Sequence, residues 1–284
     1  MGVKTCPCAP QQMARIGRAD RPKLSEYSER VVRKMKNLAI IPARSGSKGL
    51  PDKNIMPLCG KPLLTYSVDA ALQSGIFDTV HVSTDSANYA EIAKSCGADV
   101  PFLRSEKNSS DTASSWDAAQ EVLDRYSDLG KQFDNFMLLQ PTSPLRTSAD
   151  IAAAFALMEK KRAEAVVSVC PASYPPVWYY KLSKEGVMKS FIRNGAHQKR
   201  RQDAEPFFRV NGAIYLIHTT CFKKNPDISR GTCFAYLMGK ERSIDIDDNI
   251  DFLFAEAVLT RRDEWRESAA PAGHSFRNAA KGWP

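Results

Sequence analysis

Residues 37–54 read NLAIIPARSGSKGLPDKN and join an apolar run to a polar loop that contains two glycines. The apolar run, residues 37–42, predicts a short buried β-strand. In open α/β sheets, ligands bind beyond the carboxyl ends of the strands, which is where the polar loop begins. The stretch therefore predicts a ligand-binding loop at the end of a strand.

Short apolar runs and helical patterns alternate through the chain on either side of this loop. Predicted strands lie at 79–83, 135–139, 165–169 and 212–217, and predicted helices at 63–74, 87–96, 115–126 and 250–259. Such alternation is typical of a parallel sheet covered by helices. We therefore predict an α/β fold with a mostly parallel sheet.

The pattern also predicts how the chain is organised. Residues 1–36 are basic and lack a periodic apolar face, which predicts a tail; alternatively, translation starts at Met35. A single domain is predicted over 37–262, with an insertion at about 174–205, where prolines, aromatic residues and a basic cluster interrupt the pattern. Residues 263–284 are predicted to be a disordered tail.

Composition excludes several kinds of protein. The apolar runs are far shorter than the roughly 20 residues that a membrane-spanning helix needs. The net charge of +8 fits a basic tail and an anionic substrate. The sequence lacks the interleaved aromatic and basic residues that would indicate nucleic-acid binding. The seven cysteines lack zinc-site spacing, which predicts reduced thiols in the cytoplasm.

The loop at 42–54 has the composition of a phosphate-binding loop. Arg44, Lys48 and Lys53 supply positive charge, and the glycines allow backbone amides to converge on an anion. The loop matches neither GxxxxGK[ST] nor GxGxxG, so it does not predict an ATPase or a dehydrogenase. The alternative is a solvated basic turn.

A second motif, SIDID at 243–247, predicts a metal site. In an extended segment Asp245 and Asp247 point to the same face, and Mg²⁺ binds a few carboxylate oxygens together with water and substrate phosphates. Alternatively, these acidic residues belong to a helix cap, because Asp248 and Asn249 precede a predicted helix.

Two polar turns lie between these motifs, SSDTASS at 109–115 and LQPTSPLR at 139–146. The second follows a predicted strand and should face the same ligand crevice. Capping of the next helix is expected of Ser114 or Ser148. Ligand contacts are expected of Ser115, Gln140 or Thr142.

With FRVNGAIY at 208–215, these motifs resemble, in order, those of the CMP-sialic acid synthetases (acylneuraminate cytidylyltransferases) over residues 37–262. The resemblance implies a Rossmann-like sheet of the nucleotide-diphospho-sugar transferase type. It also implies attack of a sugar hydroxyl on the α-phosphorus of CTP, which yields a CMP-sugar and pyrophosphate. A homodimer formed through the insertion is expected.

The resemblance also implies roles for individual residues. CTP would be bound by Arg44, Lys48, Lys53, Asn54, Arg104 and Ser115. The sugar acid would be bound by Gln140, Arg201 and Arg209, and Mg²⁺ by Asp245 and Asp247. Catalysis would involve Arg44, Lys53, Arg201, Asp245 and Asp247.

One position departs from the family. Trp178 stands where sialic acid enzymes often have a sugar-binding lysine, and it cannot donate the same charge-assisted hydrogen bond. The acceptor could then be a related nine-carbon acid such as legionaminic acid, or Trp178 could serve a dimer contact. Two other functions stay open: a cytidylyltransferase for the eight-carbon sugar acid of lipopolysaccharide, and an inactive nucleotide-binding partner subunit.

Overall fold

The computed structural model describes residues 35–46, 49–190, 206–227 and 231–261 of the 284-residue chain. The two predicted tails lie almost entirely outside these residues, as do Lys48 and Arg201. What the sequence predicts for them therefore stays a prediction.

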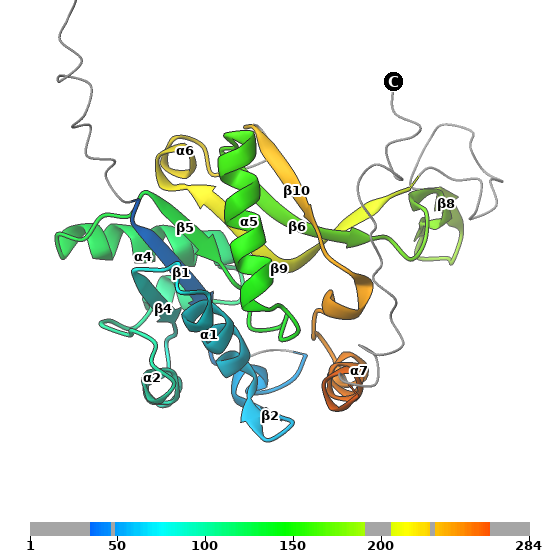
Figure 1. The fold of residues 1–284 in the computed structure, drawn as a ribbon. Coiled ribbons are helices and arrows are strands. Elements are labelled where there is room, and N and C mark those ends of the chain that lie inside the picture. Colours follow the sequence, from blue (N-terminus) through cyan, green and yellow to red (C-terminus); the bar gives the residue numbers. More distant parts are fainter. Residues whose placement is uncertain (1–34, 47–48, 191–205, 228–230, 262–284) are drawn as a thin grey trace, which may run out of the picture. The chain divides into compact units, whose positions relative to one another are not determined.

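The core of the fold is a six-stranded sheet (Figure 1). In spatial order its strands are β10 (Cys233–Leu237), β6 (Ala165–Pro171), β9 (Phe208–His218), β5 (Asn135–Leu138), β1 (Asn37–Pro42) and β4 (Thr79–Ser83). β1 pairs in parallel with β4 and β5, and β10 with β6, whereas β9 is antiparallel to both of its neighbours. The predicted α/β fold with a mostly parallel sheet is confirmed.

Helices cover both faces of this sheet and bury an apolar core on each. One face is packed by α1 (Leu63–Ser74), α2 (Ala87–Ser95) and α5 (Ser148–Lys161). The other is packed by α4 (Ser115–Asp128) and α6 (Thr219–Lys224), through buried side chains such as Val122, Tyr126 and Phe222. Because both faces are buried, strands such as β1 are apolar throughout, which is why they are visible in the sequence.

The predicted elements are all present, and their ends differ by a few residues. For α5 the sequence analysis gave a possible cap but no range; its N-cap is Thr147, whose side chain accepts a hydrogen bond from the Asp150 backbone N–H at 3.3 Å. Of the two serines expected to cap helices, Ser114 does so for α4, but Ser148 does not, because it is already the first residue of α5. The final helix, α7, covers Asn249–Thr260.

The remaining elements are short. η2 (Lys53–Ile55), β2 (Pro57–Leu58) and β3 (Lys61–Pro62) follow the first loop, and α3 (Glu106–Ser109) precedes α4. Within the predicted insertion, the structure describes η3 (Pro176–Trp178) and a hairpin of β7 (Tyr180–Leu182) and β8 (Met188–Ser190), whose apolar side chains are largely exposed. In the described part of the chain, no helix is both long and apolar enough to span a membrane.

Candidate active site

A cavity of ≈ 430 Å³ lies beyond the carboxyl end of β1. Its lining includes six residues that the sequence analysis selected: Arg44, Lys53, Asn54, Arg104, Ser115 and Gln140. The structure thus brings the first loop, the start of α4 and the end of β5 together. Thr142, from the same polar turn as Gln140, also lines it.

The first loop is held against β4 and α2. Ala43 N–H donates to the Ser83 carbonyl at 2.8 Å, and the backbone N–H and hydroxyl of Ser45 both donate to Asp85 at 2.8 Å. Burial opposes ionisation of Asp85, but the hydrogen bonds from Ser45 hold the pKa of this carboxyl below its usual value. Asp85 therefore stays ionised and fixes the loop.

Arg44, in the first loop, lines this cavity and is held by the SSDTASS turn. Its Nη1 donates to Asp111 Oδ1 at 2.9 Å and to the carbonyls of Ser110 and Ser109 at 3.2 and 3.4 Å. The Asn54 amide donates to the Arg44 carbonyl at 3.0 Å and fixes its backbone. The SSDTASS turn therefore acts as a partner for the guanidinium of the first loop.

Arg104 forms another wall of this cavity. Its Nη2 donates to the Ser83 carbonyl at 2.7 Å, its Nε donates to Ser83 Oγ at 3.0 Å, and its backbone N–H donates to Thr84 at 2.8 Å. Burial lowers the pKa of Arg104 to about 10, so the side chain is still a cation at neutral pH.

Lys53 links the first loop to the acidic motif near the end of the domain. Its Nζ donates to the Ile246 carbonyl at 2.5 Å and to Asp247 Oδ1 at 3.2 Å. The loop also approaches this motif closely at Gly49, where a Cβ atom would lie 2.7 Å from the Asp247 carbonyl oxygen. Two motifs about 190 residues apart thus form one site.

The acidic motif does not serve as the cap of α7 through Asp245 or Asp247. The N-cap is Asp248, whose Oδ1 accepts from Ile250 N–H at 2.8 Å and from Asp251 N–H at 3.0 Å. Asp251 completes the capping box. The interpretation of this motif as a helix cap is therefore correct for Asp248 but not for Asp245 or Asp247.

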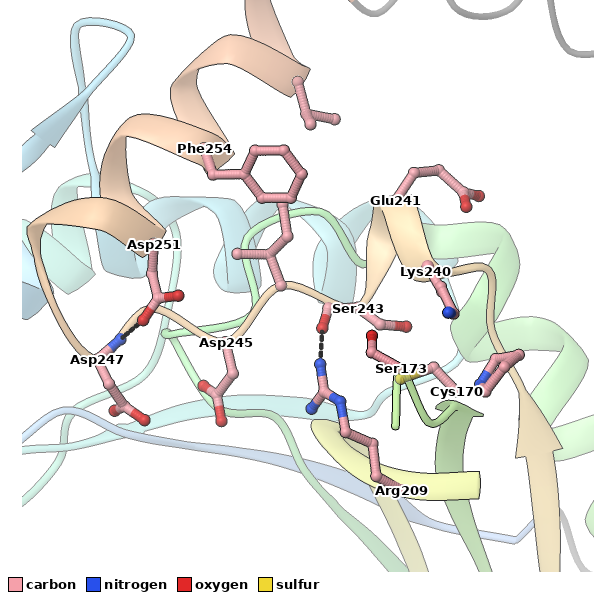
Figure 2. A pocket seen from close by; sticks show the side chains of 13 residues that line it. Cys170, Ser173, Arg209, Lys240, Glu241, Ser243, Asp245, Asp247, Asp251 and Phe254 are labelled. Carbon is pink, nitrogen blue, oxygen red and sulfur yellow. Dashed lines mark hydrogen bonds between the residues drawn. The ribbon is translucent and has the colours of Figure 1, made fainter. Parts of the chain in front are cut away.

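Asp245 and Asp247 point to the same side of the extended segment (Figure 2). Asp245 Oδ1 is buried and has no hydrogen-bond partner among the described residues, and burial, helped by the charge of Asp247, raises the pKa of this carboxyl. A buried carboxylate oxygen without a donor is suited to a cation. The described residues contain no group of three or more metal-binding side chains, so water and substrate would have to complete the shell.

A second cavity, of ≈ 730 Å³, lies on the other side of this acidic segment. Its lining includes Ser173, Arg209, Lys240, Asp245, Asp247 and Phe254 (Figure 2). Asp247 lines both cavities. The pair of carboxylates therefore stands at the boundary between a basic pocket and a larger mixed one.

Gly212, on β9, also lies at this boundary. Its φ is +78°, and a Cβ atom there would collide with Gln140 Oε1 and lie 3.2 Å from Asp245 Oδ2. Glycine thus lets a residue of the first cavity and a residue of the second approach the same point of the sheet.

Comparison with known proteins agrees with this architecture. Residues 38–190, more than half of the chain, match the family model described as Cytidylyltransferase. The chain belongs to the cytidylyltransferase family.

Three relatives indicate the range of this family. The chain is 40% identical over 222 residues to an N-acylneuraminate cytidylyltransferase of Streptococcus agalactiae, covering 77% of this chain and 52% of the relative. It is 36% identical to the CMP-N,N'-diacetyllegionaminic acid synthase of Legionella pneumophila, covering 81% of this chain and 99% of the relative. It is 31% identical to a Campylobacter jejuni pseudaminic acid cytidylyltransferase, covering 79% of this chain and 96% of the relative.

The chain thus spans about half the length of the N-acylneuraminate relatives and nearly all of the other two. A solved structure of CMP:2-keto-3-deoxy-manno-octonic acid synthetase complexed with CTP has a similar fold, with a TM-score of 0.61, 17% identity and coverage of 80% of this chain and 99% of that one.

Some residues that line the second cavity could not be identified from the sequence. Ser173 follows β6, and Lys240 lies in the turn η6 (Lys240–Arg242) after β10. Neither belongs to a recognisable motif, and their proximity results from the parallel pairing of β6 with β10. Among the residues that were predicted, Arg209 lies in the second cavity, and Gln140 lines the first.

Proposed function

We propose that this chain transfers the cytidylyl group of CTP to a nine-carbon sugar acid and releases pyrophosphate. The observation that carries this proposal is the pair of adjoining cavities, one with the cations of a phosphate-binding loop and one with Arg209, which meet at Asp247. The names of the similar N-acylneuraminate, legionaminic acid and pseudaminic acid enzymes support it.

On the nucleotide side, Arg44 and Lys53 would bind the phosphates of CTP, together with Lys48, which lies outside the described residues. Asn54, Arg104 and Ser115 would complete the pocket around the nucleoside. Since these cations are held by protein carbonyls and carboxylates before CTP arrives, little reorganisation is required on binding.

Arg209 of the second cavity would orient the sugar acid, together with Gln140, which lines the first cavity but approaches Asp245 of the second at Gly212. Arg201, the third residue expected to bind the sugar acid, lies outside the described residues. The anomeric oxygen would form a bond to the α-phosphorus of CTP as the bond to the bridging oxygen of pyrophosphate breaks. The proton of the attacking hydroxyl would pass to a water molecule in this step. Arg201 is assigned to positioning, because a guanidinium with a pKa above about 12 is a poor base.

Asp245 and Asp247 would hold Mg²⁺, which fits the buried oxygen of Asp245 that lacks a donor among the described residues. When bound, Mg²⁺ supplies positive charge that offsets the negative charge developing on the phosphate oxygens. Lys53 holds the Ile246 carbonyl and the Asp247 carboxylate, so it would keep this segment in place.

The proposal is tested by measuring pyrophosphate release with CTP and each of four acceptors: N-acetylneuraminate, N,N'-diacetyllegionaminate, pseudaminate and the eight-carbon 2-keto-3-deoxy-manno-octonate. Turnover with at least one nine-carbon acid, and much less with the eight-carbon acid, is expected. Turnover with the eight-carbon acid alone would favour the lipopolysaccharide enzyme. CTP binding without turnover would favour an inactive partner subunit.

We also propose a homodimer formed through the insertion and a cytoplasmic location. The exposed apolar side chains of the hairpin, among them Tyr180, Leu182 and Met188, support a covered surface there. Trp178 stacks near Tyr174, with ring centroids 6.1 Å apart, and is not among the described lining of either cavity. Sedimentation as a monomer at micromolar concentration would contradict the dimer.

A further inference from the structure

The turn η6 forms one wall of the second cavity and is fixed at its end. Arg242 forms an ion pair with Asp150 of α5, a carboxylate that is only 2% exposed and also accepts from Tyr236 at 2.9 Å. The next residue, Ser243, is buried and donates to the Gly239 carbonyl at 2.7 Å. The backbone of this turn therefore has little freedom to move.

The two other side chains of η6 point in opposite directions (Figure 2). Glu241 points away from Arg209, and one of its oxygens lies 3.6 Å from Arg242 Nε. Lys240 lies on the side of Ser173 and Arg209. Lys240 is an exposed residue of the cavity lining, and its ammonium group has no hydrogen-bond or ion-pair partner among the described residues.

Arg209, the other cation of this cavity's described lining, and two of its carboxylates are engaged with the protein. Arg209 Nη2 donates to the Ser243 carbonyl at 2.9 Å, Asp247 pairs with Lys53, and Asp251 accepts from the backbone at the start of α7. Within the described lining, Lys240 is thus the cation whose donors are all available to a ligand.

We propose that Lys240 is a substrate-binding residue that binds the carboxylate of the acceptor. The proposal rests on the function proposed above, because it takes the second cavity to be the acceptor site. A carboxylate is favoured over a phosphate, because Lys240 lines only the second cavity, whereas the phosphate-binding cations Arg44 and Lys53 line the first. The ammonium can form a charge-assisted hydrogen bond with a carboxylate, and the ion pair of Arg242 with Asp150 holds the turn that carries it.

The test compares Lys240→Met, which keeps the length of the side chain but removes its charge, with Lys240→Arg, which keeps the charge. Lys160→Met, on the exposed side of α5, is the matched control. For Lys240→Met we expect the KM of the sugar acid to rise about tenfold, as for loss of one charge-assisted hydrogen bond. The KM of CTP and kcat should stay within about twofold, and Lys240→Arg should recover most of the loss.

Steady-state pyrophosphate release with N-acetylneuraminate and N,N'-diacetyllegionaminate as acceptors provides these constants, and thermal unfolding shows whether each variant is folded. An unchanged KM for the acceptor in Lys240→Met would overturn the proposal. So would an equal rise in the KM of CTP, because the ammonium would then serve the phosphates. An equally large rise in the acceptor KM of Lys160→Met would also overturn it, because the rise would then come from the net charge of the protein.

Failure of the proposed function can be distinguished from failure of the proposal for Lys240, because the wild-type protein would then show no turnover. In that case, binding of N-acetylneuraminate to wild type and to Lys240→Met, measured by NMR titration, decides the matter. Weaker binding to the variant supports Lys240 as the carboxylate ligand. Equal binding, or no binding to either protein, overturns it.

Discussion

The two cavities that meet at Asp247 differ in how far their charges are engaged before any substrate binds. Around the first, Arg44, Lys53 and Arg104, all the cations of the described lining, are fixed by hydrogen bonds to protein oxygens. Around the second, which is larger, Lys240 is without such a partner among the described residues. In the proposed function, the first cavity would bind CTP with cations that the protein already holds in place, and the second would bind the acceptor with a cation that has no protein partner among the described residues.

The largest expected effect concerns Lys53, because it contacts the segment that both cavities share. Lys53→Met should lower kcat/KM by roughly 10³-fold, since it removes a phosphate-binding charge and also the anchor of Ile246 and Asp247. The constants for both substrates should change. If only the KM of CTP rose, Lys53 would belong to the nucleotide pocket alone, and the two cavities would not be coupled there.

A substitution at Gly212 tests how tightly residues pack at the boundary between the two cavities. Gly212→Ala places a methyl group against Gln140 and Asp245 at a φ of +78°, which should lower the free energy of unfolding by about 2 to 3 kcal/mol. Urea unfolding at neutral pH measures this. Gly186→Ala is the control, because Gly186 has a φ of +82° but no atoms within 4 Å of the added Cβ, and should cost less.

The sheet behind the nucleotide pocket should be sensitive to acid. His81, on β4, is fully buried, and burial, with the charges of Arg104 and Arg125, lowers its pKa to about 3. In the unfolded chain a histidine has a pKa near 6.5, so the unfolded state binds more protons below this pH. Stability is therefore complete above about pH 6.5 and falls as the pH falls toward 3, by about 2 kcal/mol at pH 5.

Urea unfolding at pH 7 and pH 5 measures this loss, and His81→Gln, which can still form a hydrogen bond with the Tyr126 hydroxyl, should reduce it. An equal loss in the variant would assign the acid sensitivity to other groups.

The smallest expected effect sharpens the contrast between the cavities. Arg44→Met removes a cation of the first cavity and should raise the KM of CTP about tenfold while leaving the KM of the acceptor nearly unchanged. This is the reverse of the pattern expected for Lys240→Met. Similar changes in both constants would mean that the first cavity does not discriminate between the substrates.

The first cavity was largely predictable from sequence, because its residues lie in local motifs that directly follow strands. Arg44 and Lys53 follow β1, and Gln140 follows β5. Alternation in an extended segment likewise predicted that Asp245 and Asp247 would point together.

The acceptor side was much less predictable. Ser173 and Lys240 become neighbours only because β6 and β10, which are far apart in the sequence, pair in parallel. Local patterns do not specify which strands pair. The turn that carries Lys240 is likewise held by the ion pair of Arg242 with Asp150, two residues far apart in the sequence.

The central claim is that Asp245 and Asp247 bind a catalytic Mg²⁺ at the junction of the two cavities. Its most direct test is pyrophosphate release against Mg²⁺ concentration for wild type and Asp245→Asn, with thermal unfolding alongside. We expect the rate of the variant to fall by roughly 10²-fold or more, with a weaker dependence on Mg²⁺, little change in CTP binding and intact folding. Equal rates and equal dependence on Mg²⁺ in the two proteins would contradict the claim.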